Sequence, residues 1–267
     1  MLKKVAIIVP FYQNIISAYE KIALQQCERI LNAHPKIAIK PTSLTLPEDA
    51  NAVTFSDVIS FDDNYFKGLA GYNRLMLSSE FYDRFAEYEY VLIYQMDCFV
   101  FKDELTYWCQ QDLDYIGAPW IKKTYHKNAA ELLWLRLGKY FSGRFNSADN
   151  EVPNKYQLEN KVGNGGFSLR RVKKFYDLCI IMKPTIDFYL SNATNLYNED
   201  VFWSIEVNRE KRVLNIPACE TGLKFAFEVP PLKAHMLNEQ SLPFGCHDWD
   251  KYADFWRPIF KWYNFNI

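Results

Sequence analysis

The sequence predicts an α/β domain in which a mixed, mainly parallel central sheet is flanked by helices. The first sixty residues alternate strand-like and helix-like patterns, an order that favours such a sheet. The runs Val5–Val9 and Tyr90–Tyr94 are short, continuous and apolar, as is typical of strands buried on both faces. The chain has 267 residues, of which 49% are hydrophobic, enough to build one packed core.

The first sixty residues predict a strand, a helix and two further strands. Val5–Val9 forms the first strand. Ser17 and Glu20 have the spacing of a capping box at the start of a helix, and apolar residues at helical spacing follow. Lys36–Lys40 alternates as an outer strand would, and Val53–Phe61 predicts the next strand.

The middle of the chain predicts a helix, two strands and an insertion. Lys67–Phe85 has apolar residues on one helical face, and Tyr90–Tyr94 is the strongest strand pattern of the chain. Residues 113–118 predict a shorter strand. Residues 122–160 have no regular pattern, so we interpret them as an insertion over one face of the domain.

The last hundred residues predict more strands and helices without an evident linker. Gly166–Leu169 predicts a short strand, and apolar residues from Val172 to Met182 predict the helix after it. Val213–Cys219 and Leu223–Phe227 have strand patterns, and the aromatic tail Asp250–Ile267 predicts a final helix. The chain therefore reads as a single domain.

Composition and charge exclude some classes of partner. The net charge of -1 gives no bulk electrostatic case for binding nucleic acid. Between residues 122 and 144, basic residues alternate with apolar ones. This stretch is suited to peripheral contact with an anionic membrane or an acidic acceptor, although a solvated helix face that also packs on the core is the commoner explanation of such a pattern.

Cysteine spacing and the N-terminus indicate the compartment. The six cysteines are scattered without a CxxC pair, which indicates reduced thiols in a cytosolic protein. The apolar run before Pro10 is too short for a signal peptide or a membrane span. We therefore expect a cytoplasmic protein.

Asp97 follows the strongest predicted strand. Ligand sites of open α/β sheets lie at the carboxyl ends of strands. A carboxylate there suits a divalent cation that carries a diphosphate. Gln95 points to the same side and can donate or accept a hydrogen bond. The structural alternative is an Asp that caps the following turn.

Gly163–Gly166 places three glycines in four residues directly before a predicted strand. Glycines are costly in conformational entropy, so this density favours a backbone that adopts positive φ or approaches a ligand closely. A plain tight turn before the strand is the alternative.

Asn198-Glu199-Asp200 is predicted to open a helix, with Asn198 as the N-cap. Acidic residues also stabilise a first helical turn without any catalytic role. Asp200 is a candidate general base, because a carboxylate can accept the proton of an acceptor hydroxyl. A helix N-terminus weakens such a base, whereas burial strengthens it.

His247 follows Pro and Gly in a predicted loop. Its imidazole is a candidate nitrogen ligand, which favours manganese over calcium. His235 competes for any such role.

Four motifs in chain order resemble those of the GT-A class of nucleotide-sugar glycosyltransferases. They are Gln95–Asp97, Gly163–Gly166, Asn198–Asp200 and the segment that ends at His247. Gly163–Arg170, Asn198–Ser204 and Pro243–Trp249 also resemble a little-characterised bacterial family of GT-A-like proteins. The resemblance implies one GT-A-like, Rossmann-like domain. It divides the chain into a nucleotide-binding half at 1–118, an irregular insertion at 119–160, and an acceptor and catalytic half at 161–267.

The resemblance also implies a metal site. Asp97 matches the last Asp of the DxD motif, Gln95 stands in place of its first Asp, and His247 matches the C-terminal metal ligand. The implied cofactor is a divalent metal, manganese or magnesium. Gln95 removes one carboxylate and weakens the case for strict metal dependence.

Further site residues follow from the same resemblance. Glu199 and Asp200 match the acidic xED pair, with Asp200 as the base and Glu199 positioning a sugar hydroxyl. The remaining residues are expected to bind the donor nucleotide sugar. They are Pro10, Phe11, Tyr12, Asp62, Arg74, Gln95, Gly165 and Gly166.

The function that the resemblance implies is inverting transfer of a sugar from a UDP or GDP donor. The acceptor is a glycan or a lipid-linked intermediate of bacterial surface polysaccharide synthesis, at the inner face of the membrane. A nucleotidyltransferase is disfavoured, because Pro10–Asn14 is not the Gly-rich, basic loop that such enzymes carry after strand one. A non-catalytic nucleotide- or glycan-binding module with a decayed metal site stays as the alternative, since Gln95 permits it.

Overall fold

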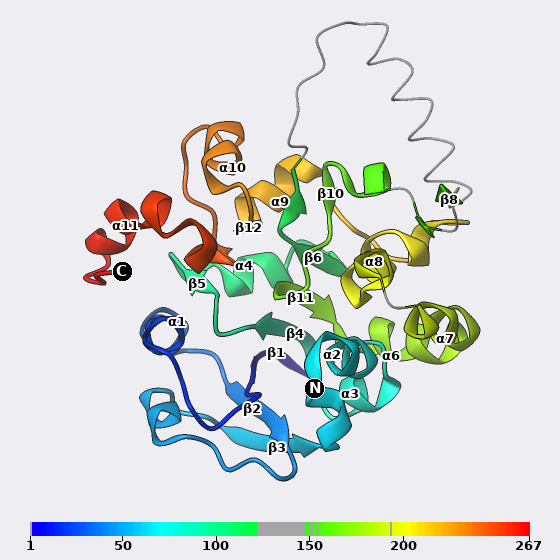
Figure 1. The fold of residues 1–267 in the computed structure, drawn as a ribbon, viewed down its shortest axis with the longest axis horizontal. Coiled ribbons are helices and arrows are strands. Elements are labelled where there is room, and N and C mark those ends of the chain that lie inside the picture. The colour runs from blue at the N-terminus through cyan, green and yellow to red at the C-terminus, as the bar shows by residue number, and fades with distance from the viewer. Residues whose placement is uncertain (1, 122–147, 150–151, 154, 193) are drawn as a thin grey trace, which may run out of the picture.

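A six-stranded mixed sheet forms the centre of the molecule (Figure 1). The computed structural model describes residues 2–121, 148–149, 152–153, 155–192 and 194–267. The strands of the central sheet, in spatial order, are β3 (Asp57–Phe61), β2 (Lys36–Pro41), β1 (Lys3–Pro10), β4 (Tyr88–Tyr94), β11 (Phe167–Arg171) and β6 (Tyr115–Gly117). The first four are parallel, and β11 is antiparallel to β4 and β6. The predicted fold class, a mixed and mainly parallel sheet flanked by helices, is confirmed.

Helices cover both faces of this sheet (Figure 1). The α-helices are α1 (Ala18–Ile30), α2 (Gly68–Met76), α3 (Ser79–Asp83), α4 (Leu105–Cys109), α6 (Val172–Ile181), α7 (Lys183–Ser191), α8 (Glu199–Ser204), α9 (Cys219–Phe225), α10 (Pro231–Leu237) and α11 (Ala253–Trp262). The 3₁₀ helices are η1 (Glu48–Ala52), η2 (Asp63–Phe66), η3 (Lys155–Leu158), η4 (Asn195–Tyr197), η5 (Glu206–Asn208) and η6 (Trp249–Tyr252).

Short strands complete the structure. A three-stranded sheet has the order β12 (Ala226–Phe227), β13 (Gly245–Cys246) and β5 (Phe99–Val100). The two-stranded ladders pair β10 (Lys161–Val162) with β7 (Pro119–Trp120), and β8 (Ala148–Asp149) with β9 (Val152–Pro153).

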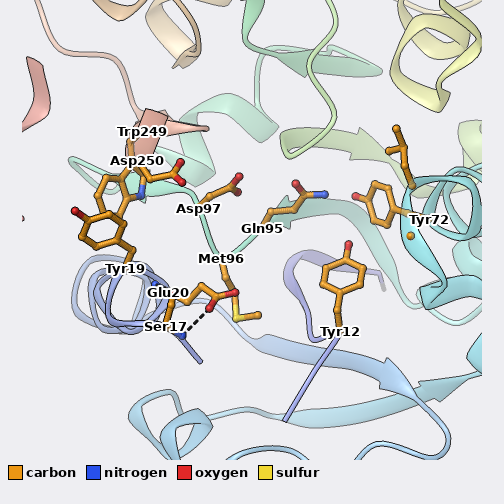
Figure 2. A pocket seen from close by; sticks show the side chains of 12 residues that line it. Tyr12, Ser17, Tyr19, Glu20, Tyr72, Gln95, Met96, Asp97, Trp249 and Asp250 are labelled. Atoms are coloured by element: carbon orange, nitrogen blue, oxygen red, sulfur yellow. Dashed lines mark hydrogen bonds between the residues drawn. The ribbon is translucent and has the colours of Figure 1, made fainter. Parts of the chain in front are cut away.

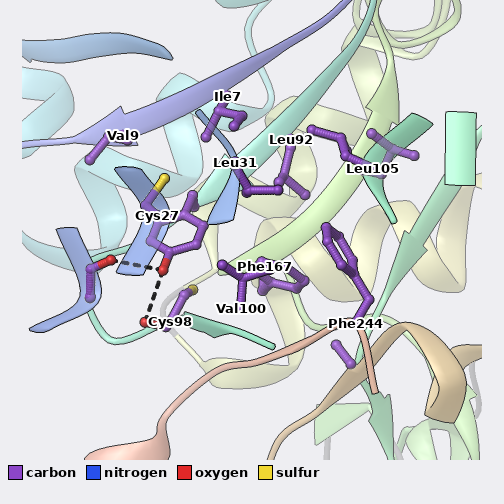
Figure 3. Packing of buried hydrophobic residues seen from close by; sticks show 14 of the residues in the cluster. Ile7, Val9, Cys27, Leu31, Leu92, Cys98, Val100, Leu105, Phe167 and Phe244 are labelled. Atoms are coloured by element: carbon purple, nitrogen blue, oxygen red, sulfur yellow. Dashed lines mark hydrogen bonds between the residues drawn. The ribbon is translucent and has the colours of Figure 1, made fainter. Parts of the chain in front are cut away.

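The core divides between the two faces of the central sheet because strand side chains alternate. On β4, Leu92 lies in the cluster that α1 and α4 cover, and Val91 lies in the cluster that α2, α3, α6 and α8 cover. Figure 3 shows the first cluster, in which Ile7 and Leu92 meet Cys27 and Leu31 from the α1 side. Burial on both faces explains the continuous apolar runs of the sequence.

The interior place of β2 contradicts the outer position predicted for Lys36–Lys40. β2 pairs with both β1 and β3. Lys36 is buried, and its ammonium pairs with Glu28 at 3.1 Å, so this polar residue at the start of the strand does not mark a solvent face.

The strand predicted at Val213–Cys219 was wrong. The carboxamide oxygen of Asn208 instead accepts hydrogen bonds from the N–H groups of Val213 and Leu214, which gives this loop partners without a ladder. Of the strand predicted at Leu223–Phe227, only Ala226–Phe227 is strand, because α9 extends through Phe225.

Other predicted elements are confirmed with changed bounds. The predicted helix at Lys67–Phe85 is interrupted, because the Ser78 hydroxyl accepts from the N–H of Phe81 and starts a second helix. The capping box of Ser17 and Glu20 is present on α1. The structure does not describe residues 122–147, where most of the predicted insertion lies. No helix in the described part of the chain is long and apolar enough to span a membrane.

Candidate active site

Asp97 lies in a tight turn at the carboxyl end of β4. The N–H of Cys98 donates to the carbonyl of Gln95 at 3.0 Å, which closes the turn. The N–H of Gln95 donates to the carbonyl of Gly166, so the turn is joined to the glycine loop. The backbone thus presents Gln95 and Asp97 beyond the edge of the sheet, where open α/β sheets bind ligands.

The three-stranded sheet of β12, β13 and β5 places His247 beside Asp97. β5 begins two residues after Asp97, and its antiparallel partner β13 ends at the residue before His247. The Nε2 atom of His247 therefore lies 3.2 Å from Asp97 Oδ1 and 3.1 Å from Gln95 Oε1. The parallel neighbour β12 ends just before Glu228, whose Oε1 is 3.7 Å from His247 Nδ1.

Charges within this group shift two pKa values. Burial alone would raise the pKa of Asp97, but the adjacent imidazole of His247 lowers it below its ordinary value. Burial alone would lower the pKa of His247, but the carboxylates of Asp97 and Glu228 raise it well above its ordinary value. His247 is therefore held between two carboxylates, one at each ring nitrogen.

Close packing explains the glycine loop. A Cβ atom at Gly165 would lie 2.2 Å from Glu199 Oε1, and one at Gly166 would lie 2.0 Å from His247 Nε2. A Cβ at Gly163 would lie 2.2 Å from the ring of Trp120. Positive φ is not the reason, since the positive-φ glycine of the described chain is Gly68. The glycines allow the side chains of the site to approach the loop.

Arg170 neutralises Glu199 inside the protein. Its Nη2 atom lies 3.0 Å from Glu199 Oε1, and both side chains are buried. The guanidinium also donates to the hydroxyls of Tyr82 and Ser168 and to the carbonyl of Gly165. This network fixes Glu199 against the glycine loop, whereas the second carboxylate oxygen of Glu199, Oε2, has no hydrogen-bond partner among the described residues.

Asp200 opens α8 beside Glu199 and takes no part in that ion pair. Its Oδ1 accepts from the N–H of Val201 at 2.8 Å. Burial, followed by the negative charges of Glu199 and Glu228, raises the pKa of Asp200 to about 8. The predicted N-cap Asn198 makes no capping bond with its side chain; Asn73 of α2 accepts from the N–H of Glu199 instead.

A cavity of about 500 Å³ lies beside Asp97 (Figure 2). Tyr12 follows β1, Tyr72 comes from α2, and Gln95 and Asp97 lie between the two tyrosines and Asp250. The described residues that line it include neither lysine nor arginine. They are Tyr12, Ser17, Tyr19, Glu20, Gly68, Leu69, Tyr72, Gln95, Met96, Asp97, Trp249 and Asp250.

Several residues predicted to bind the donor lie elsewhere. Phe11 is fully buried and packs edge-on against Phe55, so its side chain is not available to a ligand. Pro10 is the last residue of β1, and Asp62 caps η2 by accepting from the N–H of Asn64. Neither lines the cavity.

Arg74 is directed away from the cavity. It follows Tyr72 by two residues, which places it roughly 200° around α2 from the tyrosine. Arg74 is exposed, and Gly68, Leu69 and Tyr72 are the residues of α2 that line the cavity. The direct donor contact predicted for Arg74 therefore has no support from its position.

Sequence reasoning missed several polar residues of the site. Glu228 directly follows β12, which pairs with β13 before His247. Both strands have two residues, and a pattern of two residues is too short to predict a strand from sequence. Asp248 and Asp250 follow His247 in the run His-Asp-Trp-Asp, which was a visible signal. Arg170 lies in the predicted strand after the glycine loop, where a charged residue on a buried strand also indicated a buried partner.

At this site lie several buried polar atoms that have no hydrogen-bond partner in the part of the chain that the structure describes. They include the Tyr72 hydroxyl, Asp97 Oδ1, Glu199 Oε2, His247 Nδ1 and Trp249 Nε1. Such atoms in a native fold commonly meet a ligand, an ion or water. Ligating atoms of Asp97, Cys98 and His247 lie within 4.8 Å of one another, as do those of Asp97, Asp248 and Asp250. The mixed nitrogen and oxygen donors fit a divalent cation.

The fold is that of the GT-A glycosyltransferases. A crystal structure of the galactosyltransferase LgtC, in complex with donor and acceptor sugar analogues, matches with a TM-score of 0.51 and 15% identity. The match covers 91% of this chain and 86% of LgtC. Core-mannan synthase A (CmsA/Ktr4) from Aspergillus fumigatus, in its Mn/GDP form, has a TM-score of 0.44 and 12% identity over 76% of this chain and 70% of its own. The mannosyltransferase Ktr4p from S. cerevisiae, in complex with GDP, has a TM-score of 0.42 and 13% identity over 82% of this chain and 68% of its own.

The chain belongs to the family described as "Protein of unknown function (DUF5672)", whose model matches residues 55–247. The match begins before β3 and ends at His247, so it includes the Asp97 turn, the glycine loop and α8. No curated protein matches the sequence.

Proposed function

We propose that the protein is a glycosyltransferase that moves a sugar from a nucleoside-diphosphate donor to a hydroxyl acceptor, with the help of a divalent cation and with inversion at the anomeric carbon. One observation carries the proposal. The cavity at the carboxyl ends of β1 and β4 is lined by carboxylates, with neither lysine nor arginine among its described lining residues, and Asp97 lies there against His247. A diphosphate would be repelled from such a cavity unless a cation bound with it.

The side chains that would hold the cation are Asp97 and His247. A manganese or magnesium ion bound there supplies positive charge that stabilises the departing nucleoside diphosphate. Tyr12 and Tyr72 offer aromatic faces at the other side of the cavity, where we assign the nucleoside of a UDP or GDP donor.

Asp200 is the proposed general base. Its carboxylate has no ion-pair partner in the described part of the chain, and its pKa of about 8 suits proton transfer near neutral pH. Glu199 is held by Arg170, so we assign it to positioning the substrate and not to proton transfer. Its Oε2 atom, which has no hydrogen-bond partner among the described residues, is placed to accept a hydrogen bond from a sugar hydroxyl. The acceptor oxygen, once deprotonated, attacks the anomeric carbon and the diphosphate leaves.

Calorimetric titration with UDP and GDP, with and without manganese, tests the donor site. We expect binding that requires the metal and is lost in Asp97→Ala and His247→Ala. Asp177→Ala, which removes a surface carboxylate from α6, is the matched control and should bind as the wild type does. Binding that is indifferent to manganese and to both site variants would contradict the cation-dependent site.

Incubation with a panel of nucleotide sugars and simple glycan acceptors tests turnover, and NMR of the product anomer tests inversion. A retained anomeric configuration would remove the base role of Asp200.

The acceptor class rests on the sequence alone. We assign a glycan or a lipid-linked intermediate of bacterial surface polysaccharide synthesis, met at the inner membrane face, from the basic and apolar stretch at 122–145. Deletion of this stretch should lower the membrane-bound fraction of the protein in cell fractionation. An unchanged fraction would count against the membrane contact.

Gln95 favours a second candidate, a nucleotide- or glycan-binding module with a decayed catalytic site. Gln95 Oε1 lies 3.1 Å from His247 Nε2 at a position where the resemblance expects a carboxylate. The module would bind the nucleotide or a glycan yet neither transfer nor hydrolyse any donor, so the same titrations combined with turnover assays separate the two functions.

A further inference from the structure

A second cavity, of about 460 Å³, lies between α4, α9 and the turn that follows α10. The described residues that line it come from positions 102–108, from α9 and from positions 237–242. None of them also lines the donor cavity beside Asp97. A hollow of this volume is within the range of small-molecule sites, and the proposed transfer makes no use of it.

An exposed aromatic ring forms one wall of this second cavity. Tyr107 of α4 lines the cavity and is 53% exposed. Its ring packs edge-on against Trp108, with ring centroids 5.2 Å apart, and Trp108 packs edge-on against the buried Phe225. These contacts hold the Tyr107 ring in place while much of it stays exposed. Such a ring is a pre-oriented platform for a flat apolar surface, and the C–H face of a pyranose is one.

Polar side chains of both charges line the same cavity. Carboxylate acceptors come from Glu104, Glu220 and Glu239, and ammonium donors come from Lys102 and Lys224. Lys102 and Glu104 pair at 2.8 Å, so donors and acceptors lie next to one another. An ionic ligand of either sign meets like charges among these described residues. A sugar hydroxyl both donates and accepts hydrogen bonds, so a neutral sugar suits the mixture.

The turn after α10 holds Glu239 at the cavity in a strained backbone. Glu239 and Gln240 have φ angles of 54° and 58°, in the left-handed region that side chains other than glycine rarely adopt. Hydrogen bonds fix this turn: the N–H of Gln240 donates to the carbonyl of His235 at 2.8 Å, and the Asn238 carboxamide donates to the carbonyl of Ser241 at 2.9 Å. Strain that the surrounding structure fixes in this way is common at ligand-binding turns.

We propose that this cavity binds a segment of a neutral oligosaccharide, with one sugar ring stacked on Tyr107 and its hydroxyls hydrogen-bonded to the surrounding carboxylates and ammonium groups. The inference goes beyond the proposed function, because the sugar held here is not the one that reacts. Neither Asp97 nor Asp200 lines this cavity, so the proposal applies to a transferase and to a binding module alike.

Saturation-transfer difference NMR on the full-length protein, with neither metal nor nucleotide added, tests the site. The probes are maltopentaose, cellopentaose and chitopentaose, which differ in linkage and in the substituent at C2. We expect at least one probe to bind, and titration of that probe gives its dissociation constant. Saturating UDP or GDP with manganese should leave this constant within about 2-fold, because the two cavities share no described lining residue.

Variants of Tyr107 sharpen the test. Tyr107→Ala should weaken binding of the probe by at least about 10-fold, because the stacked ring face is lost. Tyr107→Phe keeps that face and should stay within about 3-fold of wild type. Tyr252→Ala removes another exposed tyrosine, one that lines neither cavity, and as the matched control it should bind as the wild type does. Circular dichroism checks the fold of each variant.

Each outcome decides the inference. Failure of all three probes to bind the wild type overturns it, and so does wild-type affinity in Tyr107→Ala or an equal loss in Tyr107→Ala and Tyr252→Ala. Displacement of the probe by nucleotide and manganese also overturns it, because the glycan then lies in the donor cavity. Titration of the same preparations with nucleotide and manganese reports on the proposed function separately, since these variants leave Asp97 and His247 unchanged.

Discussion

Two groups of acidic residues meet in the site, and they differ in the described basic groups that face them. Glu199 is buried against Arg170, which is itself fixed by Tyr82 and Ser168. Among the described residues around Asp97, by contrast, carboxylates approach one another with His247 between them and Lys251 beside Asp248, and no arginine pairs with them. The same residue type therefore has two roles. Paired with an arginine inside the fold, as in Glu199, it stabilises the arrangement of the site; around Asp97 it supplies the proposed ligands of a cation.

Asp200 is partly buried beside Glu199 but takes no part in the ion pair with Arg170. Its substitution has the largest expected effect. Asp200→Asn should lower the turnover number by about 10²–10⁴-fold, the usual contribution of a general base, because an amide cannot accept the proton. Nucleotide binding should persist, since Asp200 does not line the donor cavity. Steady-state kinetics and calorimetry on the same preparation measure both quantities. Normal turnover in the variant would remove Asp200 from the mechanism.

Breaking the neutralised pair should cost stability. Arg170→Met leaves the Glu199 carboxylate buried and unpaired, so we expect a loss of about 3–5 kcal/mol in the free energy of unfolding, measured by urea denaturation. Lys173→Met, which removes a surface partner of Asp177, is the control and should stay within about 0.5 kcal/mol. The double variant Arg170→Met with Glu199→Gln should recover part of the loss. Equal stability of Arg170→Met and wild type would show that the pair is not buried as described.

Residues at the ends of strong elements were predictable from the sequence. Asp97 follows an apolar strand, and Glu199 and Asp200 open a helix, so local patterns fixed their places. His247 was predicted as a candidate ligand because it closely follows Pro243 and Gly245 in a chain with four histidines, and the structure places it beside Asp97. The fold class followed from the same alternation of elements.

What the sequence did not reveal depends on long-range packing. Glu228 reaches His247 through strands of two residues, and no local pattern defines strands so short. Position 166 needs glycine because His247, which is 81 positions later in the chain, packs against it. Arg74 shows the converse: helix geometry alone already placed it on a different face from Tyr72.

Gly166→Ala tests how closely the glycine loop approaches the group formed by Asp97, His247 and Gln95. A Cβ there would lie 2.0 Å from His247 Nε2 and 2.7 Å from Gln95 Oε1. We expect a loss of about 1–3 kcal/mol in the free energy of unfolding, because overpacking displaces side chains, together with weaker manganese binding. Gly222→Ala is the control, since its Cβ would meet Val162 Cγ2 at 2.6 Å, which crowds a contact outside the cation site. Unchanged manganese affinity in Gly166→Ala would mean that His247 can move without consequence for the ion.

The last expected effect is a gain in stability. The pKa of Asp200 in the folded protein is about 8, above its ordinary value of 3.8, so across that interval the folded state holds a proton that the unfolded state has lost. Folding of the wild type therefore loses stability as pH rises through this window. Asparagine does not titrate, so the melting temperature of Asp200→Asn should exceed that of wild type by an amount that grows from pH 4 to pH 8. Each kcal/mol gained in the free energy of unfolding should raise the melting temperature by about 2–4 °C. Asp177→Asn, which removes one surface charge, is the control for net charge. A difference that stays constant with pH would mean that the Asp200 carboxyl is not destabilised by its surroundings, and the contrast with the paired Glu199 would then rest on geometry alone.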